Sequence, residues 1–506
     1  MIRYSCFNLF AAAVVMGVAC GLANAQDFPS TNPIPGIPPA TGFQLKLEDV
    51  IEIPRNRGSR PRLELLTHLG DGSGRLYVAD QLGMLYSFLP GDTEPSIVLD
   101  VDEHAPGFLR TGGQKGFRSF AFHPNYATAG TPGFGKLYTA YSARRTTGGD
   151  HDSVVAEWTL ADDGTVDTAI APREILRVQQ PRGDHNIGRI GFNPNLNPGD
   201  SDYGNLYVAF GDGGNYRTDS GDDTLNPNGQ DTTNLLGSML RLDPTMPDEN
   251  AGTAYTVPAD NPFVDDDNIL SEIWAYGLRN PHTFGWDPES GKMLIGDIGQ
   301  SGIEEVNLGA SGANYGWPLR EGTFSVEGKR PLSSQPIAVD ELPADHPTDP
   351  YTYPVAQYDH DPGDVGNDIG NAAIVGGFVS RNSRVPQLDG KYLFGDFANN
   401  TGPIYVVDET DLVQREDFSD LASLSGGYLA PFEELSLLDE NDEPATLLDI
   451  IRVASNNSRL GRTDLRFGQG EDGEVYVLNK QDSQIRRFAI VPEPTGITLI
   501  TLGVAG

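Results

Sequence analysis

One histidine stands out among the residues that could serve catalysis. His185 lies in the segment GDHNIGRIGF, between an aspartate and an asparagine, just before the chain turns apolar. A neutral imidazole is the usual general base near neutral pH when a partner holds its second ring nitrogen. Asp184 is adjacent, and Asp212 in AFGDGGN would close the next strand on the same side. A loop histidine is more often structural or solvated, so both interpretations stay open at this point.

A second candidate group lies in the segment AYGLRNPHTFGW, where an apolar strand is expected to end at Gly277. Pro281 restricts the residue before it to extended backbone. Arg279 is then presented at a strand end with Asn280 beside it, and arginine binds planar carboxylates through two parallel hydrogen bonds. The alternative is a surface arginine that closes a turn.

A third candidate is the irregular turn GDIGQ, in which the backbone carbonyls of Gly299 and Gln300 could face a hard cation. Calcium takes oxygen ligands of this kind. Acidic loops at 212–231 and 361–371 offer further oxygen atoms, but neither has the glutamate spacing of an EF-hand. The sequence pattern alone therefore leaves the identity of the ion open.

Composition and missing motifs exclude several classes of function. The 506 residues carry 71 acidic and 35 basic side chains, a net charge of −36, which argues against binding to nucleic acid. The chain has no Walker loop, no G-x-S-x-G and no HExxH motif. Its two cysteines, Cys6 and Cys20, both fall inside a predicted signal peptide. The mature protein would therefore have no disulfide, no thiolate metal site and no cysteine nucleophile.

Both ends of the chain look like targeting segments. Residues 1–25 have a basic start, an apolar centre and an A-x-A cleavage site, which predicts a secretory signal peptide and a secreted, periplasmic or cell-surface location. A lipoprotein signal at Cys20 is the second choice. Residues 26–44 are a proline-rich linker, and 491–506 combine VPEP with an apolar run, which resembles the PEP-CTERM sorting tail of Gram-negative bacteria. No membrane span is expected in the mature domain, because the apolar run of the signal is too short.

The elements that must position the candidate residues repeat along the chain. Each repeat is a glycine turn, a polar residue and alternating apolar β-formers: GSGRLYVAD, GKLYTAYSA, GNLYVAFGD, GKMLIGDIG, GKYLFGDFA and GEVYVLNK. Six such hairpin signals predict an all-β fold, a six-bladed β-propeller over 45–490 with long inter-strand loops. A β-helix or two sandwiches are the competing folds. Residues 232–243 could form a turn or two of helix, and binding residues are expected on loops at one end of the channel.

Taken together, these segments resemble the glucose/sorbosone dehydrogenase family, the soluble quinoprotein sugar dehydrogenases. The matching stretches, in the family's order, are GFRSFAFHPNYATAG with KLYTAYS, DHNIGRIGF with NLYVAFGDGGN, NGQDTTNLLGSMLRLD, WAYGLRNPHTFGWDP, IGDIGQSGIEEVNLGASGANYGWP and VGGFVSRNSRVPQLDGKYLFGDF. The resemblance covers 45–490 and implies a six-bladed propeller, in agreement with the repeats. It also implies oxidation of an aldose sugar at its anomeric hydroxyl to the lactone, with pyrroloquinoline quinone (PQQ) and calcium (Ca2+) as cofactors.

The resemblance assigns roles residue by residue. His185 looks like the general base, and Asp212 looks like the carboxylate that orients it. Gly299 and Gln300 match the turn whose carbonyls hold the calcium. The cofactor contacts that it implies are Gln114, Arg279, Asn280 and Arg462, with Arg381 as a candidate replacement for a lysine of the family. A soluble electron acceptor is expected, because the chain has no C-x-x-C-H haem motif.

Two other classes of function remain open on the sequence. One is a non-catalytic, calcium-stabilised propeller that binds carbohydrate or protein, and the other is a calcium-dependent lactonase-like hydrolase. A binding module has no need of the pair formed by His185 and Asp212. A hydrolase has no need of several arginines that face a tricarboxylate.

Overall fold

The computed structural model describes residues 34, 38–110, 113–161, 163–214, 227–300, 302–325, 351–360, 372–418 and 425–491. The predicted signal peptide, most of the predicted linker and the sorting tail after 491 lie outside these residues, as do most of the acidic loops at 212–231 and 361–371. The regular secondary structure of the described part is almost entirely strand, which confirms the all-β prediction. Its α-helices are α1 (Val101–His104) and α2 (Leu447–Ser455), and its short 3-10 turns are η1 (Pro227–Gly229), η3 (Pro386–Leu388), η4 (Glu409–Asp411) and η6 (Ser425–Gly427).

The strands pair as four-stranded units. The first unit contains β2 (Leu63–His68), β3 (Leu76–Asp80), β4 (Met84–Phe88) and β5 (Ser96–Asp100). The second contains β6 (Phe117–Phe122), β7 (Lys136–Ala143), β8 (His151–Thr159) and β9 (Arg173–Gln180). The third contains β10 (Ile187–Phe192), β11 (Leu206–Phe210), β12 (Ser238–Leu242) and β13 (Ile273–Tyr276).

The second half of the chain continues the pattern. The fourth unit contains β14 (Pro281–Trp286), β15 (Met293–Asp297), β16 (Ile303–Leu308) and β19 (Ala356–Asp359). The fifth contains β20 (Ile374–Val379), β21 (Lys391–Asp396), β22 (Ile404–Asp408) and β23 (Glu433–Leu438), to which β24 (Pro444–Ala445) is added. The last combines β25 (Leu465–Gln469), β26 (Val475–Asn479) and β27 (Gln484–Ile490) with β1 (Ala40–Glu52). A small hairpin, β17 (Arg320–Glu321) and β18 (Phe324–Ser325), stands apart.

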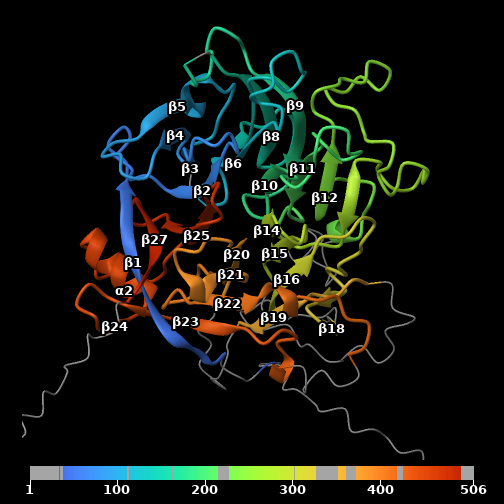
Figure 1. Cartoon of the computed structure of the whole chain (residues 1–506). Helices are drawn as coiled ribbons and strands as arrows, with labels where there is room; N and C mark the ends of the chain where they lie inside the picture. The colour runs from blue at the N-terminus through green and yellow to red at the C-terminus, as the bar shows by residue number, and fades with distance from the viewer. Residues whose placement is uncertain are drawn as a thin grey trace, which may run out of the picture.

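The first strands of the units surround a central channel. β2 contacts β6, β6 contacts β10, β10 contacts β14, β14 contacts β20, and β20 contacts β25, which returns to β2. Figure 1 looks along this channel and shows the labels of these strands around its centre. Apolar side chains fill the spaces between the units, and Trp158, Tyr138 and Phe210 are among the largest that are fully buried. A ring of antiparallel sheets around a channel is the β-propeller that the repeats predict.

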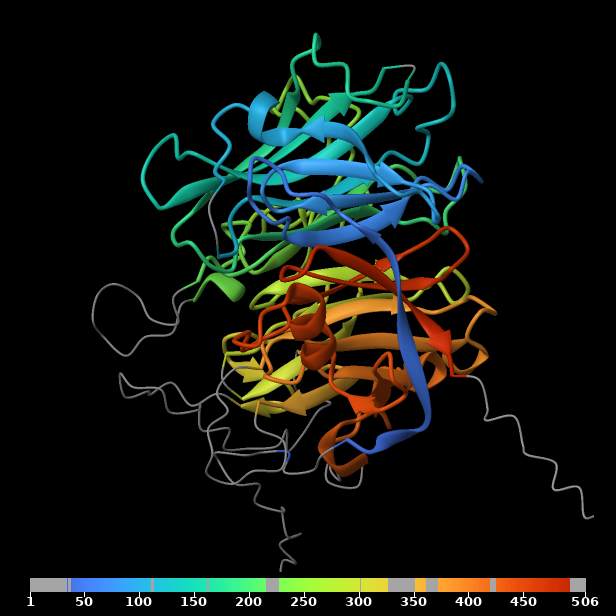
Figure 2. The same ribbon diagram turned by 90° about the vertical axis from the view of Figure 1, so that its left-hand side faces the viewer.

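The N-terminal strand completes the last unit. β1 pairs antiparallel with β27 and, along its other edge, parallel with β23 of the neighbouring unit. Figure 2 shows it as a long ribbon that crosses the side of the molecule. The strand begins at Ala40, so the end of the predicted linker belongs to the propeller. The prediction of a helical turn within 232–243 was also wrong, because Ser238–Leu242 is a fully buried strand.

The repeated glycine turns of the sequence lie at equivalent places in the fold. Each precedes the second strand of a unit, and each glycine has a positive φ that other residues rarely adopt: Gly74, Gly135, Gly204, Gly291, Gly390 and Gly473. These turns reverse the chain between the innermost strand and its neighbour. The loops that precede the innermost strands therefore gather at one end of the channel.

Four innermost strands carry a β-bulge near their start. The pairing register gains one residue at Glu64 in β2, at Arg118 in β6, within Gly188–Arg189 in β10 and at His282 in β14. A bulge bends the strand and redirects the side chain of the extra residue. Here Glu64, Arg118, Arg189 and His282 all line a cavity in the channel.

Candidate functional site

His185 and Asp212 meet at the end of the hairpin formed by β10 and β11. His185 precedes β10, Asp212 follows β11, and Ile187 is paired with Phe210 between them. Nδ1 of His185 lies 2.6 Å from Oδ1 of Asp212. The histidine side chain is 13% exposed, whereas that of the aspartate is 1% exposed. The imidazole is thus held from behind and open at the front, as a general base requires.

The backbone around His185 is tightly constrained. Its φ of 50° lies in the left-handed region, where a residue other than glycine is strained. Its N–H donates to Oε1 of Gln114 at 2.8 Å, and its carbonyl accepts from the N–H of Gly213 at 3.1 Å. A Cβ at Gly211 would lie 2.5 Å from that carbonyl oxygen, so the hairpin needs glycine there. These contacts fix the direction in which the imidazole points.

Asp212 is a buried carboxylate that stays ionised. Burial by itself would raise its pKa, but His185, the hydrogen bonds that it accepts and the charge of Arg279 together hold the pKa below its usual value. Oδ2 accepts from the indole Nε1 of Trp317 at 2.9 Å, and Oδ1 also accepts from the N–H of Gly214 at 2.9 Å. An ionised partner can only accept, so we infer that the histidine proton lies on Nδ1. In the neutral form of the ring, Nε2 then has the free lone pair, and it hydrogen bonds to no described residue.

Arg279 and Asn280 are positioned by one buried carboxylate. Their backbone N–H groups donate to Asp297 at 2.9 and 2.6 Å. Burial raises the pKa of Asp297, and these hydrogen bonds oppose that shift. The carbonyl of Arg279 accepts from the N–H of Asp212 at 2.8 Å, and its guanidinium lies 5.5 Å from the ring of Trp317. The arginine pair and the histidine pair therefore form one connected group.

The turn at Gly299 presents oxygen atoms to a positive charge. Nη1 of Arg279 donates to the carbonyls of Ile298 and Gly299 at 2.7 and 2.5 Å, and its Nη2 donates to Oε1 of Gln300 at 2.6 Å. Oxygen atoms that converge on a guanidinium also suit a hard cation such as calcium. Within the described residues, no three acidic, histidine or cysteine side chains are arranged to share a metal ion. The donors available at this turn are thus mainly carbonyls.

The structure does not bring Arg381 to this group. Arg381 follows β20 and pairs through Nε and Nη2 with both oxygens of Asp287, at 2.8 and 2.6 Å. Asp287 follows the end of β14, whereas Asn280 precedes its start, so the length of β14 separates the two ends. Arg381 was predicted to replace the family lysine because of its position along the chain. Because it follows the end of β20, it lies at the other end of the channel.

Arg462 lies on the same end of the channel as the starts of the innermost strands. It precedes β25, its side chain is 50% exposed, and its guanidinium lies 5.5 Å from the ring of Phe397. Its Nε donates to Oδ1 of Asp464 at 2.7 Å. Among the described residues, the predicted positions that meet are therefore His185, Asp212, Gln114, Arg279, Asn280, Gly299 and Gln300.

Sequence reasoning missed two residues that hold the site together. Trp317 contacts both Asp212 and Arg279, and Asp297 orients the backbone of the arginine pair. Both lie in a stretch that was recognised, but a tryptophan before proline is usually read as core. The aspartate could have been found as the buried acid nearest to the predicted cation turn.

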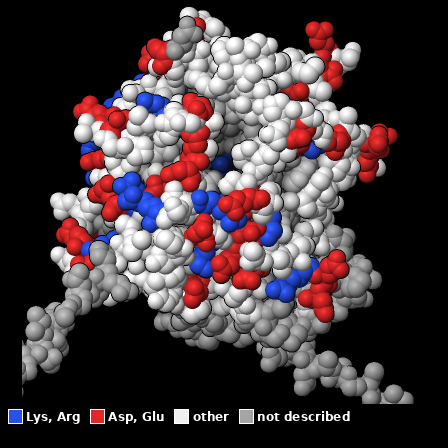
Figure 3. Space-filling model, viewed as in Figure 1, with Lys and Arg blue, Asp and Glu red and all other residues white. Residues whose placement is uncertain are grey.

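Figure 3 shows a hollow near the centre of the face seen in Figure 1, with acidic side chains on its left, a basic side chain within it, and both basic and acidic side chains below it. No helix among the described residues has the length and apolar character needed to cross a membrane.

Comparisons with known proteins agree with this fold. The family model "Glucose / Sorbosone dehydrogenase" matches residues 65–416. HIPL2 protein of Arabidopsis thaliana is 28% identical over 385 residues, which are 68% of this chain and 52% of that protein. Hedgehog-interacting protein of Mus musculus is 27% identical over 340 residues, 66% of this chain and 41% of that protein. The chain therefore spans about half the length, or less, of these curated relatives.

Among solved structures, the PQQ-bound form of aldose sugar dehydrogenase from Streptomyces coelicolor aligns with a TM-score of 0.54. It is 18% identical, and the alignment covers 90% of this chain and 99% of that one. Identity at this level shows the fold. The family model, in contrast, matches well over half of the sequence. This chain belongs to the glucose/sorbosone dehydrogenase family.

Proposed function

We propose that this protein oxidises an aldose sugar at its anomeric hydroxyl to the lactone, with PQQ and Ca2+ bound beside His185. Family membership and the likeness to a PQQ-bound aldose sugar dehydrogenase support sugar oxidation with PQQ. The observation that carries the proposal is the 2.6 Å contact between His185 Nδ1 and Asp212. It leaves Nε2 as an accessible base at the end of the channel.

The chain supplies the proton chemistry. Nε2 of His185 takes the proton of the anomeric hydroxyl, and Asp212 holds the ring and stabilises the imidazolium that results. The strained backbone of His185 and its bond to Gln114 keep the base in one orientation before the sugar arrives. Such prior ordering lowers the entropic cost of reaching the reactive geometry.

The residues present fit an anionic quinone and a cation. Arg279, Asn280 and Gln114 would hold the carboxylates and carbonyls of PQQ, and the carbonyls of Gly299 and Gln300 would hold Ca2+. Arg462, which lies outside this group but at the same end of the channel, would add a further contact to PQQ. When bound, PQQ supplies the two-electron acceptor for the hydride, and Ca2+ makes the quinone carbonyl a better acceptor. Arg279 lies where these two groups would meet, because it already contacts the carbonyl turn.

The proposal extends to the setting of the enzyme. The predicted signal peptide and sorting tail support a secreted, periplasmic or cell-surface location. Electrons would pass to a soluble acceptor.

Reconstitution tests the proposal. Purified protein is titrated with PQQ in the presence of CaCl2, and dye reduction is followed across a panel of aldoses. We expect activity to require both additions, and His185→Asn to lower kcat by about 10²–10⁴-fold while PQQ still binds. His104→Asn, in α1 and outside the site, is the matched control. Failure to bind PQQ, or full activity of His185→Asn, would overturn the proposal.

A second candidate function rests on the likeness to Hedgehog-interacting protein, whose name denotes binding to another protein. On this alternative the propeller is a non-catalytic binding module. PQQ titration separates the enzyme from the binding module. A binding module would show no saturable PQQ binding, and His185→Asn would not change dye reduction from the wild-type level. The buried, ionised partner of His185 favours the enzyme.

A further inference from the structure

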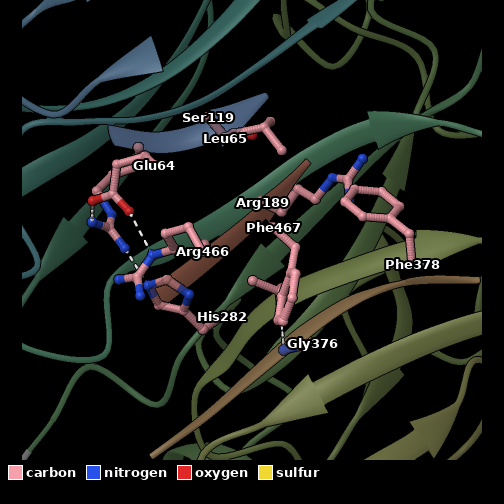
Figure 4. A pocket seen from close by; sticks show the side chains of 12 residues that line it. Glu64, Leu65, Ser119, Arg189, His282, Gly376, Phe378, Arg466 and Phe467 are labelled. Carbon is pink, nitrogen blue, oxygen red and sulfur yellow. Dashed lines mark hydrogen bonds and ion pairs between the residues drawn. The ribbon is translucent and has the colours of Figure 1, made fainter. Parts of the chain in front are cut away.

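A cluster of charged residues that does not include His185 lies at a cavity inside the channel. We name it the channel cluster: Glu64, Arg118, His282, Arg466 and Lys480. Glu64 accepts from Arg118, from Lys480 and from Nε of Arg466, the last at 3.0 Å. Figure 4 shows Glu64, Arg466 and His282 gathered on one side of the cavity. The side chains of the four charged members are at most 4% exposed.

The channel cluster carries excess positive charge. Three cations share the single carboxylate of Glu64. Burial would raise the pKa of Glu64, yet Arg118, Lys480 and Arg466 hold it far below its usual value, so the carboxylate is ionised. Burial lowers the pKa of Lys480, and the two arginines lower it further. The two arginines alone outnumber the one acid, whatever the state of the lysine.

Arg189 adds another positive charge on the opposite side of the cavity, where Figure 4 shows it beside Phe378. Its guanidinium lies 4.8 Å from that ring and 5.7 Å from the ring of Phe284, whose carbonyl it also contacts. No carboxylate among the described residues lies within ion-pair distance of it. Burial lowers the pKa of Arg189 to about 10, so it remains charged at neutral pH. Contacts with rings and a carbonyl offset only part of the cost of such burial.

Several N–H groups of the cavity wall remain available. Nε of Arg118, Nε of Arg189 and Nδ1 of His282 are buried and hydrogen bond to no described residue. Nη2 of Arg118 faces Nε2 of His282, so the imidazole accepts there and carries its proton on Nδ1. All three groups are therefore donors, which is the pattern that an anion requires.

We propose that this cavity binds a small inorganic anion of the size of chloride. The cavity, which Arg118, Arg189, His282 and Arg466 line, has a volume of about 20 Å³, enough for one water-sized sphere. A water molecule could satisfy the donors but would leave the positive charge uncompensated. A halide does both, and it links strands from opposite sides of the ring. The inference does not depend on the proposed sugar oxidation.

Anomalous diffraction tests the position. Crystals of the full chain are grown or soaked in NaBr, with sodium gluconate as the bulky control. We expect one bromide peak between Arg189 and the channel cluster, and none in Arg189→Met crystals. A cavity without bromide density in the wild-type protein overturns the proposal.

Thermal unfolding tests the binding in solution at constant ionic strength. Replacing gluconate by chloride should raise the Tm of the wild-type protein saturably, because a ligand of the folded state stabilises it by mass action. Arg189→Met should lose this response, whereas Arg384→Met, which removes an exposed arginine, should keep it. An equal response in Arg189→Met, or a wild-type response that gluconate reproduces, contradicts the proposal. Arg189→Met removes an uncompensated buried charge, so we expect it to fold.

Discussion

Replacement of Asp212 by asparagine probes the proposed catalytic pair, His185 and Asp212, with little change in shape. Oδ1 of Asp212 accepts from His185 Nδ1 and from the N–H of Gly214, and Oδ2 accepts from the indole N–H of Trp317. An asparagine has only one acceptor oxygen. If that oxygen faces His185, the amide NH2 opposes Trp317. If it faces Trp317, the NH2 opposes Gly214 and forces the histidine proton onto Nε2.

Each orientation leaves one pair of buried donors facing each other, which costs about 1–3 kcal/mol of folding free energy. The effects on kcat differ. In the first orientation His185 keeps its tautomer but exchanges a charge-assisted hydrogen bond for a neutral one, a loss of about 1–2 kcal/mol or roughly tenfold in rate. In the second, Nε2 carries the proton, and the full contribution of the base, about 10²–10⁴-fold, is lost.

The assay is steady-state dye reduction by the PQQ- and calcium-loaded protein, with Asp184→Asn as the matched control. Asp184 is the exposed neighbour of His185 and would lose one charge in the same loop. We expect kcat of Asp212→Asn to fall at least tenfold with little change in KM, because the side chain is buried behind the base. Nitrogen NMR of the imidazole would identify the tautomer. Less than a threefold change in kcat, or an equal defect in Asp184→Asn, would refute the role of the pair.

Three further predictions concern the surroundings of the site. Trp317→Phe removes an N–H donor to the charged Asp212, so the free energy of unfolding in urea should fall by about 1.5–3 kcal/mol, and an unchanged value would contradict the contact. Burial raises the pKa of Asp396 to about 7, so the folded carboxyl keeps its proton while the unfolded one ionises. Stability should therefore fall between about pH 4 and 7, by up to about 1.4 kcal/mol per pH unit from this group, and Asp396→Asn should flatten that slope in urea titrations. The same slope in both proteins would be the wrong result. Arg381→Met leaves the buried Asp287 without its bidentate partner, which should lower the free energy of unfolding by about 3–5 kcal/mol with no change in PQQ affinity, whereas weaker PQQ binding would restore Arg381 to the site.

The sequence was a good guide to the fold because its strongest signals are local. A glycine that must adopt positive φ, followed by alternating apolar residues, specifies a hairpin within a dozen positions, and Gly135 and Gly204 do so in the fold. The bulges at Glu64 and Arg118 were beyond reach, because a bulge is defined only by the register of a partner strand. The start of β1 was missed for a similar reason, since its partners lie at the other end of the chain.

In the candidate site, too, local patterns could be predicted from the sequence and contacts between distant segments could not. The contact between His185 and Asp212 could be predicted because the two residues flank consecutive strands whose pairing follows from the pattern. Arg381 was misplaced because distance along the chain does not say at which end of a strand a residue lies. Glu64 and Lys480, 416 positions apart, look like separate surface charges in the sequence. Only the closed ring makes them neighbours inside the channel.

The position of β1 has a consequence for how the molecule folds. Because this strand fills the gap between β27 and β23, the ring closes only after residues near both ends of the chain have met. Contacts so distant in sequence carry a high loop-closure entropy and form late in folding. Until then, β27 and β23 present open edges that can recruit a strand from another chain. Loss of Ala40–Glu52 would leave the edges of β27 and β23 permanently open. We therefore infer that the N-terminal strand protects the newly synthesised protein from aggregation.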